Sequence, residues 1–140
     1  MPKEAKKIKE VKKVAEKKVK IKQKRQVSSG RVYVTSTFNN TLITVTDLEG
    51  NALASSSCGA AGFKGARKST PFAATNVMEI VAKKVSEAGM RDVEVYIKGP
   101  GAGRDAALRV LKTMGFNIGL IADVTPIPHN GPRAKKERRV

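Results

Sequence analysis

The sequence has few cysteine, histidine and aromatic residues, and each shortage excludes a class of function. Its 140 residues include one Cys, one His and no Trp, and aromatic residues make up 4%. A single Cys excludes an intrachain disulfide and favours a reducing compartment. One Cys and one His also exclude a zinc site of the usual Cys/His type. So few aromatic rings argue against stacked aromatic platforms and favour phosphate and shape contacts with a structured nucleic acid.

Long hydrophobic runs are missing as well. No apolar run approaches the length that spans a membrane. The N-terminal stretch lacks the apolar core of a secretory signal, and its Lys-rich, Glu-containing character does not suit a transit peptide. We therefore expect a cytoplasmic protein.

Positive charge is abundant and lies mostly at the two ends. Of the net charge of +16, residues 1–27 carry +9, from twelve Lys and Arg against three Glu, and residues 131–140 carry +4, from five against one. The middle is left with +3, which is the pattern of a nearly balanced globule with tails that bind a polyanion. We expect a basic extension at 1–28, an α/β domain at 29–124, and a Pro-rich segment with a basic tail at 125–140.

The first 27 residues allow two interpretations. Ile8, Val11, Ala15 and Val19 are spaced to line a basic amphipathic helix, which would suit a membrane surface or a groove on a partner. The apolar stripe is thin. A solvated arm that is disordered when free and orders on RNA is the other interpretation.

The stretch 92–123 predicts a strand, a helix and a second strand, which is one βαβ unit. Its first strand alternates apolar and polar residues, and its last, 118–122, is a nearly continuous apolar run. The helix places Leu108, Leu111 and Met114 on one face and is expected to end at Gly115. Since the crossover between parallel strands is right-handed, the loop between strand and helix must open at the strand's carboxyl end.

Gly99, Gly101 and Gly103 in this loop have three possible interpretations. A dinucleotide site is disfavoured, because Arg104 stands where the third fingerprint glycine would fall, the lysine and hydroxyl of a P-loop are missing, and only one βαβ unit is present. The glycines could serve only a tight turn and close helix packing. Alternatively, their N–H groups at a helix start could face a nucleic-acid phosphate. Arg104 opposes the helix dipole unless an anion compensates.

Residues 31–58 predict an antiparallel meander with turns at Asn39-Asn40 and around Gly50, and with Val32, Val34 and Phe38 on one face. A second glycine-rich loop, 59–69, then carries clustered cations on a backbone that can approach a target closely. The residues concerned are Gly62, Lys64, Gly65, Arg67 and Lys68. Thr70 and Pro71 start a helix that Gly89 ends, and Met78 and Met90 are expected in the core.

Two further features of the sequence concern chemistry. Cys58 with His129 as its base is a conceivable nucleophilic pair, although a lone Cys in a strand is more typical of a small core residue. The prolines after Asp123 predict an extended segment. Within it, Asn130 precedes Gly131, a step that can age to isoaspartate through a succinimide.

Three motifs in this order resemble those of the universal ribosomal protein eleven family, in its bacterial small-subunit form. They are Gly62-Phe-Lys-Gly-x-Arg67-Lys68-x-Thr70-Pro71, Lys98-Gly-Pro-Gly-x-Gly-Arg104 and Asp123-Val-Thr-Pro-Ile-Pro-His-Asn-Gly131, with Arg138-Arg139-Val140 at the end. The resemblance covers about Ser29 to Val140. The sequence departs from the family pattern at five positions, of which four lie in the C-terminal tail and one is Asp105. The family usually has Cys at Pro132, paired prolines at Ala134 and Lys135, a basic residue at Glu137, and Glu at Asp105.

The resemblance implies a three-layer α/β/α fold with a mixed sheet of about five strands, akin to the ribonuclease-H-like arrangement. It implies a non-catalytic structural protein of the small ribosomal subunit, without metal or cofactor. The site would be on the platform, on central-domain ribosomal RNA hairpins, beside small-subunit proteins seven and eighteen and near the messenger exit path and the Shine-Dalgarno duplex. The candidate RNA contacts that it implies are Lys64, Arg67, Lys68, Arg104, His129, Asn130, Arg133, Lys135, Lys136, Arg138 and Arg139. Bacterial members can carry isoaspartate at the step that corresponds to Asn130.

The alternative function is a metal-dependent RNA-processing enzyme, since ribonuclease-H-like folds support such chemistry. It would need carboxylates that converge on two metal ions, and Asp47, Asp105 and Asp123 are the only plausible set. Each of these also has a local explanation as a residue of a turn, a helix start or a strand end.

Overall fold

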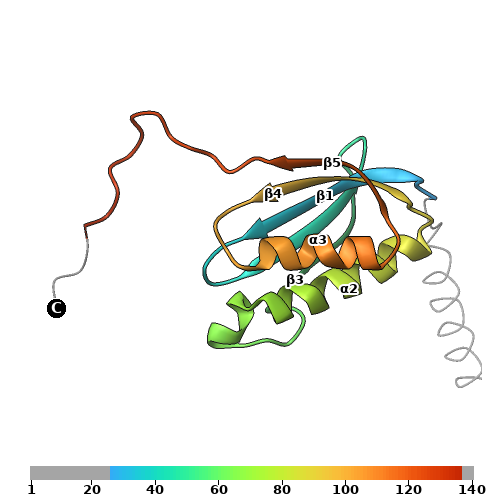
Figure 1. The fold of residues 1–140 in the computed structure, drawn as a ribbon, viewed down its shortest axis with the longest axis horizontal. Coiled ribbons are helices and arrows are strands. Elements are labelled where there is room, and N and C mark those ends of the chain that lie inside the picture. Colours follow the sequence, from blue (N-terminus) through green and yellow to red (C-terminus); the bar gives the residue numbers. More distant parts are fainter. Residues whose placement is uncertain (1–25, 137–140) are drawn as a thin grey trace, which may run out of the picture.

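The computed structural model describes residues 26–136. In this range the chain forms five strands, two α-helices and one 3-10 helix (Figure 1). In chain order they are β1 (Ser29–Ser36), β2 (Thr41–Asp47), β3 (Ala52–Ser57), the 3-10 helix η1 (Gly65–Ser69), α2 (Pro71–Glu87), β4 (Asp92–Lys98), α3 (Gly103–Thr113) and β5 (Asn117–Asp123). The predicted arm at 1–28 lies almost entirely outside the described residues, so its two interpretations stay open.

The five strands form one mixed sheet in the order β3-β2-β1-β4-β5. β2 pairs antiparallel with both β1 and β3, whereas β4 pairs parallel with β1 and with β5. Four strands therefore run in one direction and β2 alone runs in the other. The predicted α/β class, the mixed sheet of five strands and the βαβ unit over 92–123 are confirmed.

Both helices cover the same face of the sheet, so residues 26–136 form two layers rather than the three that were expected (Figure 1). The handedness of the crossovers explains why. The connection β3-α2-β4 and the connection β4-α3-β5 advance across the sheet in the same direction. Right-handed crossovers in one direction place their helices on one face. A crossover in the reverse direction would place its helix on the other face, and the described chain has none.

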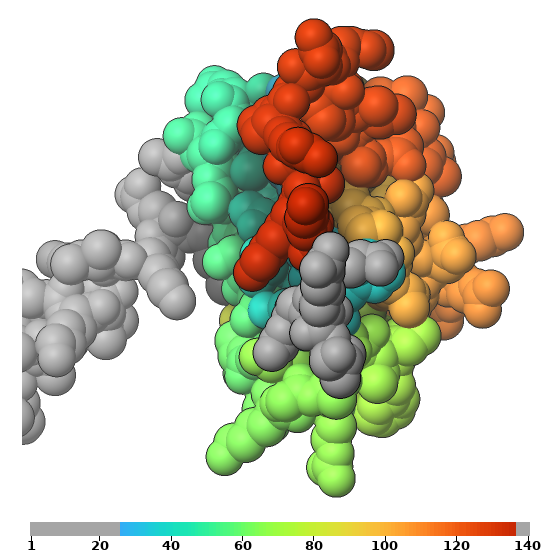
Figure 2. Space-filling view, turned by 90° about the vertical axis from the view of Figure 1, so that its left-hand side faces the viewer, coloured from blue at the N-terminus to red at the C-terminus, as the bar shows by residue number. Residues whose placement is uncertain are grey.

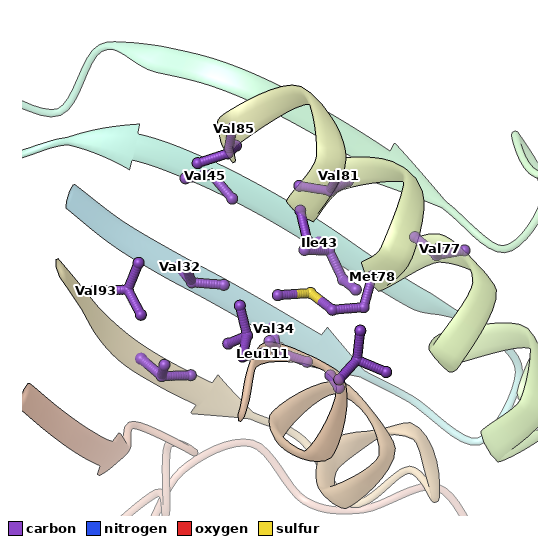
Figure 3. Packing of buried hydrophobic residues seen from close by; sticks show 14 of the residues in the cluster. Val32, Val34, Ile43, Val45, Val77, Met78, Val81, Val85, Val93 and Leu111 are labelled. Carbon is purple, nitrogen blue, oxygen red and sulfur yellow. The ribbon is translucent and has the colours of Figure 1, made fainter. Parts of the chain in front are cut away.

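The core lies between the sheet and the helices (Figure 3). Residues in β1, β2 and β4 alternate between this face and the other, as the period of two requires. The sheet contributes Val32, Val34, Ile43, Val45, Val93, Val95 and Ile97 to the core, all at most 4% exposed. From α2, Met78 reaches between the sheet residues and Leu111 of α3. Met78 and Met90 are fully buried, as predicted.

The helix boundaries follow from local signals in the sequence. Thr70 accepts a hydrogen bond from the N–H of Ala73 (3.3 Å), and Pro71 occupies the first helical position of α2. Gly89 and Gly115 follow α2 and α3 in the left-handed region, with φ of +91° and +80°. The predicted start of α2 and the predicted ends of α2 and α3 are confirmed.

Two local predictions were wrong. Phe38 does not share the buried face of β1, because the strand ends at Ser36 and Phe38 is 75% exposed in the turn to β2. The turn is centred on Phe38-Asn39 rather than on Asn39-Asn40, since the N–H of Thr37 donates to the Asn40 carbonyl. The apolar run of β5 forms the predicted strand, but it lies at the sheet edge, where Leu120 and Ile121 are about half exposed.

Candidate nucleic-acid interface

The segments with predicted site residues all leave the sheet at one edge, which we call the carboxyl edge. Since β1, β3, β4 and β5 run in one direction, the turn 37–40, the loop 59–69, the loop 99–103 and the segment 124–136 emerge side by side there. Figure 2 looks onto this edge, with the green segment forming its lower part and the red C-terminal segment crossing it. Segments up to 99 residues apart in sequence thus share one surface.

The N–H groups of the three glycines in the loop 99–103 are already paired within the chain. Gly99 donates to the Thr125 hydroxyl (3.1 Å), Gly101 to the Ser36 carbonyl (2.9 Å) and Gly103 to the Ser36 hydroxyl (3.2 Å). A phosphate at this loop would have to displace those acceptors. The geometry therefore favours a role for these glycines in packing over the phosphate-facing role that we expected.

The same glycines are needed because the loop presses on the end of β1. A Cβ at Gly99 would lie 2.2 Å from the Ser36 carbonyl oxygen, and one at Gly101 would lie 2.4 Å from the Thr37 carbonyl oxygen. Gly99 also has a φ of +97°, a conformation that favours glycine. The loop is thus locked against the end of β1.

Arg104 fixes this loop to the end of β5. Its guanidinium donates to the Gly99 carbonyl (2.9 Å) and forms a hydrogen-bonded ion pair with Asp123. The anion that compensates for a cation in the first turn of α3 is therefore supplied by the chain itself. A guanidinium has five N–H donors and the side chain is 31% exposed, so donors remain for a further acceptor such as a phosphate.

Asp123 is held in its charged form by several donors. Hydrogen bonds from the hydroxyl (2.6 Å) and the N–H (3.0 Å) of Thr125, together with Arg104, lower the pKa of its carboxyl to about 2 from an ordinary 3.8. Charge-assisted hydrogen bonds of this kind favour the carboxylate over the protonated acid. The carboxylate thereby joins the loop 99–103, α3 and the start of the C-terminal segment.

This lowered pKa predicts a pH-dependent contribution to stability. Because the pKa is lower in the folded chain than in the unfolded chain, the Asp123 contribution is fully present well above pH 3.8 and is lost as pH falls to about 2. Urea unfolding between pH 5 and pH 2 should show a smaller pH dependence in Asp123→Asn. An unchanged pH dependence in Asp123→Asn would contradict the assignment.

The loop 59–69 presents cations that are free of ion pairs within residues 26–136. Lys64 and Arg67 are exposed and Lys68 is partly exposed. Gly62 and Gly65 have positive φ, and a Cβ at either would meet open space. Phe63 anchors the loop, because its ring packs against the core and its N–H donates to the Cys58 carbonyl (3.1 Å). An anchored loop with unpaired cations is suited to bind phosphates.

The C-terminal segment begins against the sheet and then extends away from it (Figure 1). The N–H of Val124 donates to the Ile97 carbonyl (2.8 Å), and Thr125 bonds to Gly99. Beyond this anchor, the side chains of His129, Asn130, Arg133, Lys135 and Lys136 are exposed. Asn130 is the single described non-glycine residue with a positive φ, +55°. Arg138 and Arg139 lie outside the described residues.

The catalytic alternatives lack the necessary geometry. Cys58 is fully buried whereas His129 is exposed in the extended segment. Asp47 ends the antiparallel strand β2, at the edge opposite to Asp105 and Asp123, and its carboxylate accepts hydrogen bonds from Asn51. No group of three potential metal ligands occurs in the described part of the chain. The three carboxylates therefore do not converge on a metal site.

The concentration of aromatic residues at the carboxyl edge was not predicted from the sequence. Three of the four phenylalanines lie on its segments or directly after one, namely Phe38 in the turn, Phe63 in the loop 59–69 and Phe72 in the first turn of α2. Phe38 and Phe72 are 75% and 68% exposed. A low overall aromatic count does not reflect this concentration at one place. An aromatic residue directly before the Asn-Asn pair was the available signal.

Comparison with known proteins places the chain among similar sequences. Residues 30–139 match the family described as Ribosomal protein S11. The chain is 56% identical, over 119 residues, to proteins named small ribosomal subunit protein uS11 from two strains of Treponema pallidum, one of them strain Nichols. The matched region covers 85% of this chain and 94% of each relative.

Neither helix among residues 26–136 has the length and hydropathy needed to span a membrane.

Proposed function

The chain belongs to the ribosomal protein S11 family, and from this we propose that its carboxyl edge binds ribosomal RNA in the small subunit. As a family member it is a structural component of the small ribosomal subunit and not an enzyme. The observation that supports the proposal is the convergence of the loop 59–69, the loop 99–103 and the basic C-terminal segment at one edge of the sheet. Such a surface neutralises phosphates where RNA helices pack during assembly.

The contacts that we propose fall into three groups. Lys64, Arg67 and Lys68 bind phosphates directly from the loop 59–69. Arg104 both holds its own loop and offers its remaining donors to the RNA. The exposed residues of the C-terminal segment extend the contact along the RNA backbone. These residues are His129, Asn130, Arg133, Lys135 and Lys136. Arg138 and Arg139, which lie outside the described residues, are proposed as contacts from the sequence.

We propose that the RNA is the platform region of the central domain, near the messenger exit path and the Shine-Dalgarno duplex, in cytoplasmic ribosomes. The neighbours proposed are small-subunit proteins seven and eighteen. These assignments rest on the motif resemblance, and cross-linking from the carboxyl edge in assembled subunits tests them. Cross-links confined to other RNA domains and other proteins would refute this location.

We also propose Asn130 as an isoaspartate site. Its side chain is exposed, and the following Gly131 has no side chain to hinder ring closure. An isoaspartate-specific methyltransferase should label the aged wild-type chain and not Asn130→Ala. Equal labelling of both chains would exclude this site.

Binding of the full chain to RNA across a range of salt concentrations tests the function. We expect tighter binding to central-domain RNA than to an unrelated structured RNA of equal length. About six phosphate contacts on a single strand would give a slope near −4 for log K against log salt. The preference for the central-domain RNA should fall in Arg67→Ala. Equal affinity for both RNAs, lost only with the basic ends, would mean that the chain alone is an unspecific polycation.

A further inference from the structure

The turn between β1 and β2 lies at the centre of the carboxyl edge. In the strand order β3-β2-β1-β4-β5, β1 neighbours β4, which leads into the loop 99–103, and β2 neighbours β3, which leads into the loop 59–69. In Figure 1 the turquoise turn lies beside the gold loop that joins β4 to α3. The turn is therefore flanked on both sides by loops that carry candidate RNA contacts.

Phe38 projects from this turn on a well-defined backbone. The Thr37 hydroxyl accepts hydrogen bonds from the N–H groups of Asn39 (3.3 Å) and Asn40 (3.1 Å), and the N–H of Thr37 donates to the Asn40 carbonyl (2.8 Å). The Asn40 side chain accepts a further bond from the N–H of Thr41 (2.9 Å). With these bonds fixing the backbone, the Phe38 side chain is 75% exposed.

The glycine loop 99–103 supports the turn from one side. Gly101 donates to the Ser36 carbonyl, and a Cβ on Gly101 would lie 2.4 Å from the Thr37 carbonyl oxygen. Gly103 bonds the Ser36 hydroxyl, which also bonds the Thr41 hydroxyl (3.2 Å). Both ends of the turn are thus attached to the loop that Arg104 clamps. The ring is presented by a rigid platform and not by a free loop.

The surroundings of the ring favour a nucleobase over an apolar protein partner. The loop 59–69 carries Lys64 and Arg67, Arg104 lies in the first turn of α3 after the loop 99–103, and Lys98 ends the neighbouring strand β4. Of the carboxylates at this edge, Asp123 is paired with Arg104, and Asp105 is exposed in the first turn of α3. The cations therefore outnumber the carboxylates. An aromatic ring among cations matches a nucleotide, since the base stacks on the ring and its phosphates meet the cations.

We propose that the Phe38 ring stacks on an unpaired base of the RNA bound at the carboxyl edge. This inference rests on the RNA-binding function proposed above and adds a contact that reads an exposed base rather than a phosphate. It also gives the glycines of the loop 99–103 a role in recognition, because their close packing positions the turn.

Fluorescence offers a direct test, because the chain contains no Trp. In Phe38→Trp the indole is the single Trp of the full chain, and stacking on a base should quench its emission when central-domain RNA is added. Leu48→Trp is the matched control, since Leu48 is 50% exposed in the turn between β2 and β3, at the opposite edge. We expect strong quenching in the first variant and little in the second. Equal quenching in both, or none in either, would overturn the proposal.

Affinity provides the second readout. Phe38→Leu keeps an apolar side chain but removes the ring, and we expect it to bind central-domain RNA about tenfold more weakly. Phe38→Tyr should retain wild-type affinity. Because no charge is removed, the salt dependence should keep its slope in both variants. Circular dichroism and urea unfolding of Phe38→Leu should match the wild type, because the ring is outside the core.

The outcomes separate this inference from the proposed function. If the wild-type chain prefers central-domain RNA and Phe38→Leu binds as tightly as the wild type, the stacking contact is refuted while RNA binding stands. If Phe38→Leu binds RNA normally but weakens incorporation into subunits, the ring contacts a protein instead. If the wild-type chain shows no preference among RNAs, the proposed function itself fails.

Discussion

Replacing Gly101 with alanine is expected to lower the free energy of unfolding by about 3 kcal/mol. The new Cβ would lie 2.4 Å from the Thr37 carbonyl oxygen and 2.8 Å from the Ser36 carbonyl carbon. Both are backbone atoms, so neither can move aside as a flexible side chain would. Relief of the clash requires the loop to separate from β1, which also breaks the hydrogen bond from Gly101 to Ser36.

Gly119→Ala is the matched control for this prediction. Gly119 is exposed on β5, and a Cβ there would find no atom within 4 Å. We expect its free energy of unfolding to stay within about 1 kcal/mol of the wild type. Urea unfolding of both variants by circular dichroism measures the difference. Equal free energies of unfolding for Gly101→Ala and Gly119→Ala would contradict the close contact between Gly101 and the end of β1.

The same variant links stability to recognition. Movement of the loop away from β1 would release one side of the turn that carries Phe38. Under conditions where Gly101→Ala remains folded, its affinity for central-domain RNA should fall toward that of Phe38→Leu. If Gly101→Ala is less stable but binds RNA with wild-type affinity, then the close packing of the loop is not needed for the proposed Phe38 contact.

Removing the three cations of the loop 59–69 is expected to weaken RNA binding about a hundredfold near physiological salt. The triple variant carries Ala at positions 64, 67 and 68. Each lost phosphate contact should make the slope of log K against log salt shallower by about 0.7 to 0.9, so three contacts change it by about two or more. Binding to central-domain RNA across salt concentrations measures both quantities.

A charge-matched variant tests whether position matters or only net charge. Lys83, Lys84 and Lys112 are exposed in the later turns of α2 and α3, away from the carboxyl edge. Substituting all three with alanine removes the same charge of three. We expect this control to retain most of the affinity and nearly the wild-type slope. Equal losses in the two triple variants would mean that the RNA responds to overall charge and not to this loop.

The structure also changes how an Arg104 substitution should be interpreted. Arg104→Ala removes a candidate RNA contact, but it also removes the bonds to Gly99 and Asp123. Lower RNA affinity in this variant could therefore follow from a displaced loop. Arg67 is the cleaner probe, because its side chain makes no ion pair within the described residues.

Local features of the sequence determined much of this protein. Alternation with period two placed Val93, Val95 and Ile97 on one buried face, and capping signals at Thr70, Pro71 and Gly115 set helix ends. These signals work because each depends on the backbone of a few consecutive residues. The three motifs also identified the family from the sequence alone.

Contacts between distant segments were decided only by the tertiary structure. The sequence placed glycines in the loop 99–103 but could not show that Ser36, more than sixty residues earlier, accepts two of their N–H groups. It likewise could not show that Asp123 compensates for Arg104. The period-two pattern wrongly predicted that Phe38 shares the buried face of β1, because such a pattern carries no information on where the pairing of β1 with β2 ends. The turn, both loops and the C-terminal segment lie at one edge because four of the five strands run in the same direction. The order and direction of strands depend on how whole elements pack, which the sequence does not show locally.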